Sequence, residues 1–137
     1  MKNIFKYLIE AYFNKLVSLN LNLPVYDGIA PSSEKGSYIL ISSDRNSQQT
    51  PNKAGFSFTV QILIDVVIKN GNFGFKDSDN IAELITQAIN SDQQLDLTPD
   101  FQIISTVVLS QNTLSGLNPT EPTFRTLIRY QHLVSQL

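Results

Sequence analysis

The chain contains no cysteine and a single histidine among its 137 residues. Without cysteine it can form no disulfide, no cysteine-ligated zinc site and no thiol nucleophile. A serine hydrolase needs a histidine base beside its nucleophile. The single histidine, His132, lies near the C-terminus in a predicted strand, where an ordinary strand residue is the simpler interpretation. The sequence also has no Walker loop, no G-x-G-x-x-G fingerprint and no G-x-S-x-G elbow. These absences predict a protein without catalytic residues, cofactor or metal.

Charged residues are scarce as well. Asp, Glu, Lys and Arg make up 16% of the chain and the formal net charge is −2, which argues against a dedicated nucleic-acid-binding protein because such proteins usually carry a basic face. No hydrophobic run reaches the ~20 residues that span a bilayer. Residues 1–5 resemble the start of a signal peptide, but Lys6, Glu10 and Asn14 interrupt the apolar stretch. We expect a mature N-terminus, no membrane partner and no sequence-specific nucleic acid.

Apolar periodicity predicts two helices. Residues 77–80 are good N-cap residues for the second helix, and Asn80 and Glu83 have capping-box spacing. Its expected apolar stripe is Ile81, Leu84, Ile85, Ala88 and Ile89. The first helix is expected over residues 3–20 because apolar side chains recur there at helical spacing. Its stripe consists of Phe5, Leu8, Ile9, Tyr12, Phe13, Leu16 and Val17.

The clearest pattern is a period-two alternation from Phe56 to Lys69, with Leu63 and Val67 as apolar exceptions, which predicts a long strand, ~40 Å, with one buried face. Further strands are predicted at 25–26, 38–42 and 101–111. Residues 123–134 fit both a strand and a helix, although their β-branched and aromatic residues favour the strand. The buried face of the long strand should consist of Phe58, Val60, Ile62, Ile64, Val66 and Ile68.

The predicted order of elements is α-β-β-β-α-β-β, within a single domain that spans residues 1–137. Polar segments at 43–55 and 112–122 are predicted as loops, and residues 70–76 as a shorter one. Several connections are too short for parallel crossovers. The expected fold class is therefore α+β, with a mostly antiparallel four- to five-stranded sheet and two helices packed on one face.

Candidate interface residues lie in these loops and in the last strand. The cations could contact carboxylates of a partner, but they could equally stand on a solvated face. The loop phenylalanines could contact a partner or fold back onto the core. The candidates are Arg45, Lys53, Phe73, Phe75, Arg125 and Arg129.

Three aspartates, Asp77, Asp79 and Asp92, raise the question of a calcium site. Their spacing is not that of an EF-hand, which needs a glycine at its sixth position and a glutamate at its twelfth. Capping of the second helix explains the first two more simply. We expect no metal site here.

The order of elements resembles that of the phage tail completion, or tail terminator, proteins that join a tail to a head. The resemblance covers nearly the whole chain. Its most family-like part is the run Val25-Tyr26-Asp27, followed by Pro31 and then by Tyr38-Ile39-Leu40-Ile41. In that family a Val-Tyr-Asp segment precedes a proline-containing loop and a strand that often opens with Pro-Tyr. Here Ser37 stands where that proline is common.

The resemblance implies a virion subunit that forms a ring, typically a hexamer, which stops polymerisation of the tail tube and docks on the head connector. The expected partners are further copies of the chain, the tail tube protein and the head connector or stopper protein. The location would be the head-proximal end of the tail, after assembly in the bacterial cytoplasm. The family pattern has no catalytic residues to transfer, and it favours a strand for residues 123–134. Another head–tail connector, a tail tube component or a small hydrolase stays open as an alternative.

Overall fold

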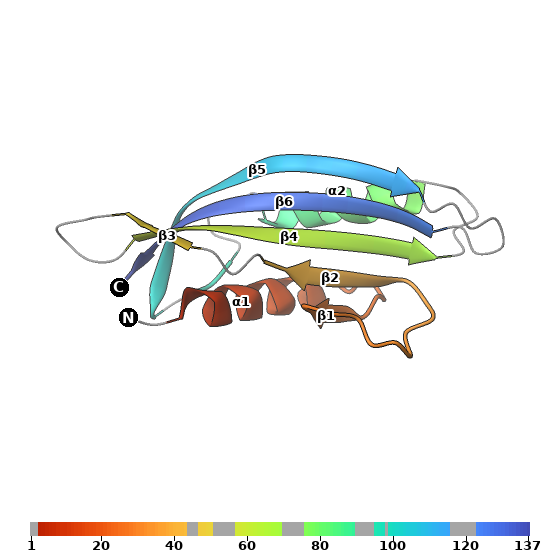
Figure 1. The fold of residues 1–137 in the computed structure, drawn as a ribbon, viewed down its shortest axis with the longest axis horizontal. Helices are drawn as coiled ribbons and strands as arrows, with labels where there is room; N and C mark the ends of the chain where they lie inside the picture. The colour runs from red at the N-terminus through yellow and green to blue at the C-terminus, as the bar shows by residue number, and fades with distance from the viewer. Residues whose placement is uncertain are drawn as a thin grey trace.

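The structure, a computed structural model, describes residues 3–43, 47–50, 57–69, 76–89, 95–97, 99–115 and 123–137. It confirms the predicted α+β class, with two helices and a mostly antiparallel sheet (Figure 1). The helices are α1 (Ile4–Ser18) and α2 (Lys76–Ile89). The strands are β1 (Val25–Asp27), β2 (Tyr38–Ser42), β3 (Ser47–Thr50), β4 (Ser57–Lys69), β5 (Phe101–Ser115) and β6 (Thr123–Gln136).

The strands form one sheet in the order β1-β2-β4-β6-β5, and β3 pairs with β4. Neighbouring strands are antiparallel except β1 and β2. β2 and β3 lie end to end along the same edge of β4, because β6 occupies the whole of its other edge. The prediction of a loop over 43–55 is therefore wrong for residues 47–50. These polar residues have no apolar alternation, and they form a strand through main-chain pairing with β4.

The core lies between one face of the sheet and the two helices. The predicted inward face of β4 is confirmed, since each of its six apolar side chains is at most 5% exposed. The segment that fitted two patterns is the strand β6, with Ile128, Tyr130 and Val134 fully buried. Helix α1 packs against β1 and β2, and α2 against β4 and β6. In Figure 1, α2 lies behind β5 and β6. None of the described helices is long and apolar enough to span a bilayer.

The buried stripe of α1 is narrower than predicted. Leu8, Tyr12 and Leu16 are at most 1% exposed and form its centre. Phe13 is 40% exposed and Val17 is 52% exposed, so both lie at the margin of the contact with the sheet. The helical spacing of apolar residues was predicted correctly, but the spacing does not show how wide the buried face of the helix is.

In α2 the helix begins earlier than predicted. It starts at Lys76, so Asn80 lies inside the helix and the predicted capping box is wrong. Asp77 and Asp79 occupy the first turn instead, where a carboxylate interacts favourably with the helix dipole. Ala82 is fully buried, whereas Leu84, expected in the stripe, is 48% exposed.

Strand β5 is longer and less regular than predicted. It continues to Ser115, and its register against β6 shifts twice, between Ile103 and Ser105 and between Val108 and Ser110. An extra residue reverses the alternation of side chains beyond it. Val108 therefore packs against the core, while Val107, predicted on the same face as Phe101, is 49% exposed.

A buried polar network joins α1, β5 and β6 inside this core. The Tyr12 hydroxyl hydrogen-bonds Nε2 of His132, and Thr106 Oγ1 lies 3.0 Å from Nδ1 of the same ring. The ring of Tyr130 stacks on the imidazole with an interplanar angle of 16°. A neutral imidazole has one donor and one acceptor nitrogen, and both are used here. Burial lowers the pKa of His132 to about 4 and raises the pKa of Tyr12.

The lowered pKa of His132 predicts sensitivity to acid. At neutral pH the imidazole is uncharged in both the folded and the unfolded chain, so it contributes nothing. As the pH falls from 6.5 to about 4, the unfolded chain binds a proton that the folded chain does not bind. The free energy of unfolding then drops by about 1.4 kcal/mol per pH unit, and by about 3 kcal/mol in all.

Urea unfolding from neutral pH to pH about 4, on the natural chain and on His132→Gln, measures this loss. Glutamine binds no proton in this range, so the variant should lack the loss that this site causes. Carboxylates titrate alike in both chains and cancel in the comparison. An equal pH dependence of the two chains would contradict the assignment.

Candidate interaction surface

The second face of the sheet is not covered by either described helix. Side chains alternate along a strand, so the odd-numbered residues of β4 and β6 point away from the core. We call this surface the open face. Its central residues are Leu40 of β2, Leu63 and Asp65 of β4, Arg125, Leu127 and Arg129 of β6, and Val107 and Leu114 of β5.

Asp65 is an acidic side chain at the centre of the open face, and it is 3% exposed. Its neighbours across the sheet are Leu40 and Leu127. Arg125 donates from Nε to Oδ1 over 3.3 Å and from Nη2 to Oδ2, so the pair is bidentate. The hydrogen bonds with Asp65 raise the pKa of Arg125. Arg125 thus neutralises the buried carboxylate of Asp65 within the chain, so its role is structural.

An aromatic and charged cluster occupies the end of the open face beside β1. Lys69 Nζ lies 5.4 Å from the ring centroid of Tyr38, and the ring of Tyr26 meets that of Tyr38 edge-on at 5.9 Å. The Tyr26 hydroxyl donates to Glu34, which also accepts the Gly36 amide over 2.9 Å. The hydrogen bond from Tyr26 is the main reason that the pKa of Glu34 is lowered. These contacts hold the β1–β2 connection in place.

Arg129 stands on the same face of β6 as Arg125 but has a different environment. It lies opposite Leu63 on one side and Ser110 on the other, with Leu127 as its neighbour along the strand face. It is half-buried. No described carboxylate pairs with its guanidinium. An arginine surrounded by aliphatic side chains is a common anchor at protein interfaces, and its fork fits a carboxylate of a partner.

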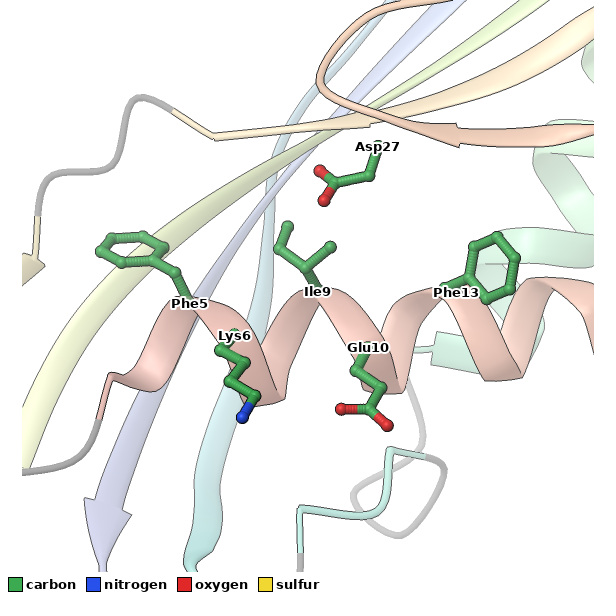
Figure 2. A pocket seen from close by; sticks show the side chains of 6 residues that line it. All are labelled: Phe5, Lys6, Ile9, Glu10, Phe13 and Asp27. Atoms are coloured by element: carbon green, nitrogen blue, oxygen red, sulfur yellow. The ribbon is translucent and has the colours of Figure 1, made fainter.

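A shallow groove of about 340 Å³ runs along α1 beside β1. Figure 2 shows Phe5, Ile9 and Phe13 on the side of the helix that faces Asp27, with Lys6 and Glu10 on the other side. Its walls are mainly apolar. In the described part of the chain, no three histidine, aspartate or glutamate side chains group as metal ligands. This groove offers apolar contact area and no convergent set of polar groups.

The predicted interface residues divide into two groups. Arg45, Lys53, Phe73 and Phe75 lie outside the described residues, as does Asp92, so their roles stay predictions. Arg125 and Arg129 share one strand face, as expected for a strand, with Leu127 between them, but they differ in their partners. Sequence reasoning missed that Asp65 pairs with Arg125. The available signal was Asp65, an acidic residue within a mostly apolar strand. The register between β4 and β6 was needed to show that Arg125 is its partner.

Comparison with known proteins gives a structural likeness. No family model and no curated protein matches the sequence. A chain from the virion of a native gene transfer agent particle has the same fold with a TM-score of 0.63, at 16% identity, over 90% of this chain and 92% of that chain. A second solved structure matches with a TM-score of 0.52, at 14% identity, over 91% and 93%. The likeness establishes a shared fold over nearly the full length.

The two arginines predict different effects on stability. Arg125→Ala leaves the buried Asp65 carboxylate without its partner and should lower the free energy of unfolding by about 3 kcal/mol. Arg129→Ala is the matched control, on the same strand and face, and should cost at most about 1 kcal/mol because no described carboxylate depends on it. Urea denaturation of both variants measures the difference. Equal losses would contradict the structural role of Arg125.

Proposed function

We propose that this chain is a structural subunit of a phage-like particle. Copies of it form a ring, with six as the expected number, at the head-proximal end of the tail. The ring ends the tail tube and joins it to the head connector or stopper protein. The chain performs no reaction in this role, and it needs no cofactor.

The observation that carries this proposal is the fold shared with a chain from a gene transfer agent virion. The match extends over 90% of this chain and 92% of the other. It agrees with the resemblance to tail completion proteins that the order of elements and the Val25–Asp27 run had suggested. Two independent comparisons, one of sequence pattern and one of shape, therefore favour the same class of particle.

The surface of the chain supports an assembly role on physical grounds. Strand β5 is an edge strand of fifteen residues without a charged residue or a proline. Soluble proteins normally guard such edges with charge, proline or a covering element, since unpaired main-chain groups invite further pairing. Ile104, Val107, Leu109 and Leu114 along it are each 43–52% exposed. A neighbouring subunit in a ring would cover this edge.

A hydrolase is less well supported. The histidine that would serve as a base is fully buried, and both of its nitrogens are hydrogen-bonded within the core. A substrate could not reach it without unfolding the contact between α1 and β6. The loop residues Arg45, Lys53, Phe73 and Phe75 stay candidates for contact with the tube protein or the connector.

Removal of the gene from the particle that encodes it tests the function. Tails assembled without the protein should lack a defined end, so electron microscopy should show tubes of abnormal length that are not joined to heads. Supplying the protein in trans should restore joining.

The result also separates the proposal from its alternatives. Tubes of normal length that are joined to heads would refute the tail-ending role. Complete absence of tubes would instead favour a tube component, and finished tails beside heads that lack their closure would favour a connector of the head.

A further inference from the structure

Helix α2 carries an outward surface that nothing in the described fold uses. Asp79 and Glu83 are exposed and stand one turn apart, and Leu84 beside them is 48% exposed. Within the described ranges, neither carboxylate has an ion-pair partner. The opposite side of the helix holds Ala82 and Ile85 in the core. The outward side of the helix thus carries two carboxylates and one exposed leucine.

The open face has the complementary character. The charged side chains that its strands carry are three cations, Lys69, Arg125 and Arg129, and one carboxylate, Asp65. Arg125 is committed to Asp65, and Lys69 lies against Tyr38. The guanidinium of Arg129 is left without a described carboxylate partner, and two of its neighbours, Leu63 and Leu127, are aliphatic. A suitable partner for Arg129 is a carboxylate with an apolar side chain close to it. Glu83 and Leu84 of α2 provide this combination.

The two surfaces cannot meet within one copy. Helix α2 packs on the core side of β4 and β6, and the open face is the other side of the same strands. Two different surfaces on opposite sides of one chain are the requirement for a heterologous contact, which repeats from copy to copy and closes into a ring when its rotation allows.

We propose that the open face of one copy packs against α2 of the next copy, with Arg129 donating to Glu83. Leu84 then lies between Leu63 and Leu127. This contact rests on the ring proposed above and specifies its interface. The occupant is a second copy because both halves of the complementary pair are present on this chain: Arg129 beside two leucines on the open face, and Glu83 beside Leu84 on α2.

Cysteine cross-linking tests the contact directly, because the natural chain contains no cysteine and an introduced thiol is the only one. Full-length Glu83→Cys and Arg129→Cys are purified separately, mixed, and treated with a short bis-maleimide. The mixture should yield at least about tenfold more covalent dimer than either variant alone. A chain carrying both changes should give a ladder of larger products. Glu10→Cys, on the exposed side of α1, replaces Glu83→Cys in the control mixture and should give no excess.

The charge pair has its own measurement. With Leu84→Cys and Leu127→Cys as reporters, adding Glu83→Lys to the first chain should lower the yield about tenfold, because it places two cations together. The matched change Glu10→Lys should leave the yield unchanged.

These outcomes distinguish the interface from the function. Equal yields from the test and control mixtures overturn the proposed contact. When purified tube protein is added to the mixture, its capture by Arg129→Cys in place of a second copy overturns the contact as well. If tails lacking the protein are nevertheless defective, the tail-ending role stands and its interface lies elsewhere. If those tails are normal, the proposed function falls even where the 83–129 product forms.

Discussion

The antiparallel pairing of β4 with β6 determines most of what this chain can do. Thirteen consecutive residue pairs join Ser57–Lys69 to the last strand. Because side chains alternate, a slip of one residue would move every core side chain of one strand to the outside. The buried apolar face of β4 prevents that slip. The register in turn places His132 against Tyr12 in the core and brings Arg125 within reach of Asp65 on the other face.

Each face of the sheet buries a polar side chain together with a hydrogen-bonding partner. On the inner face a neutral histidine is accommodated because both ring nitrogens find partners, Tyr12 and Thr106. On the open face Asp65 stays acceptable under neighbouring leucines because Arg125 approaches it with two donors. In both places burial of a polar group is made tolerable by a specific hydrogen-bonding partner from another strand or helix. Arg129, also on the open face, has no carboxylate partner within the described chain.

A sheet with helices on one side leaves its other side to solvent or to a neighbour. Here that side combines leucines, an ion pair and an arginine that no described carboxylate contacts, next to a long edge strand without charge. Such a surface is typical of a protein whose exposed face and edge strand are covered by a neighbouring subunit in an assembly. The uncovered surfaces thus support the proposed function, and no buried reactive group is needed for it.

The sequence by itself determined the class of fold, the long strand and its inward face, because a period-two alternation over so many residues is the pattern of a strand with one buried face. It put Arg125 and Arg129 on one face only on the condition that residues 123–134 form a strand, which the pattern favoured over a helix. It could not reveal β3, whose polar residues pair through the main chain, or the two register shifts that turn Val107 outward. It could not show that α2 starts at Lys76. Above all, it could not separate the two arginines. That distinction depends on Asp65, sixty positions earlier in the chain, and tertiary pairing alone brings the two together.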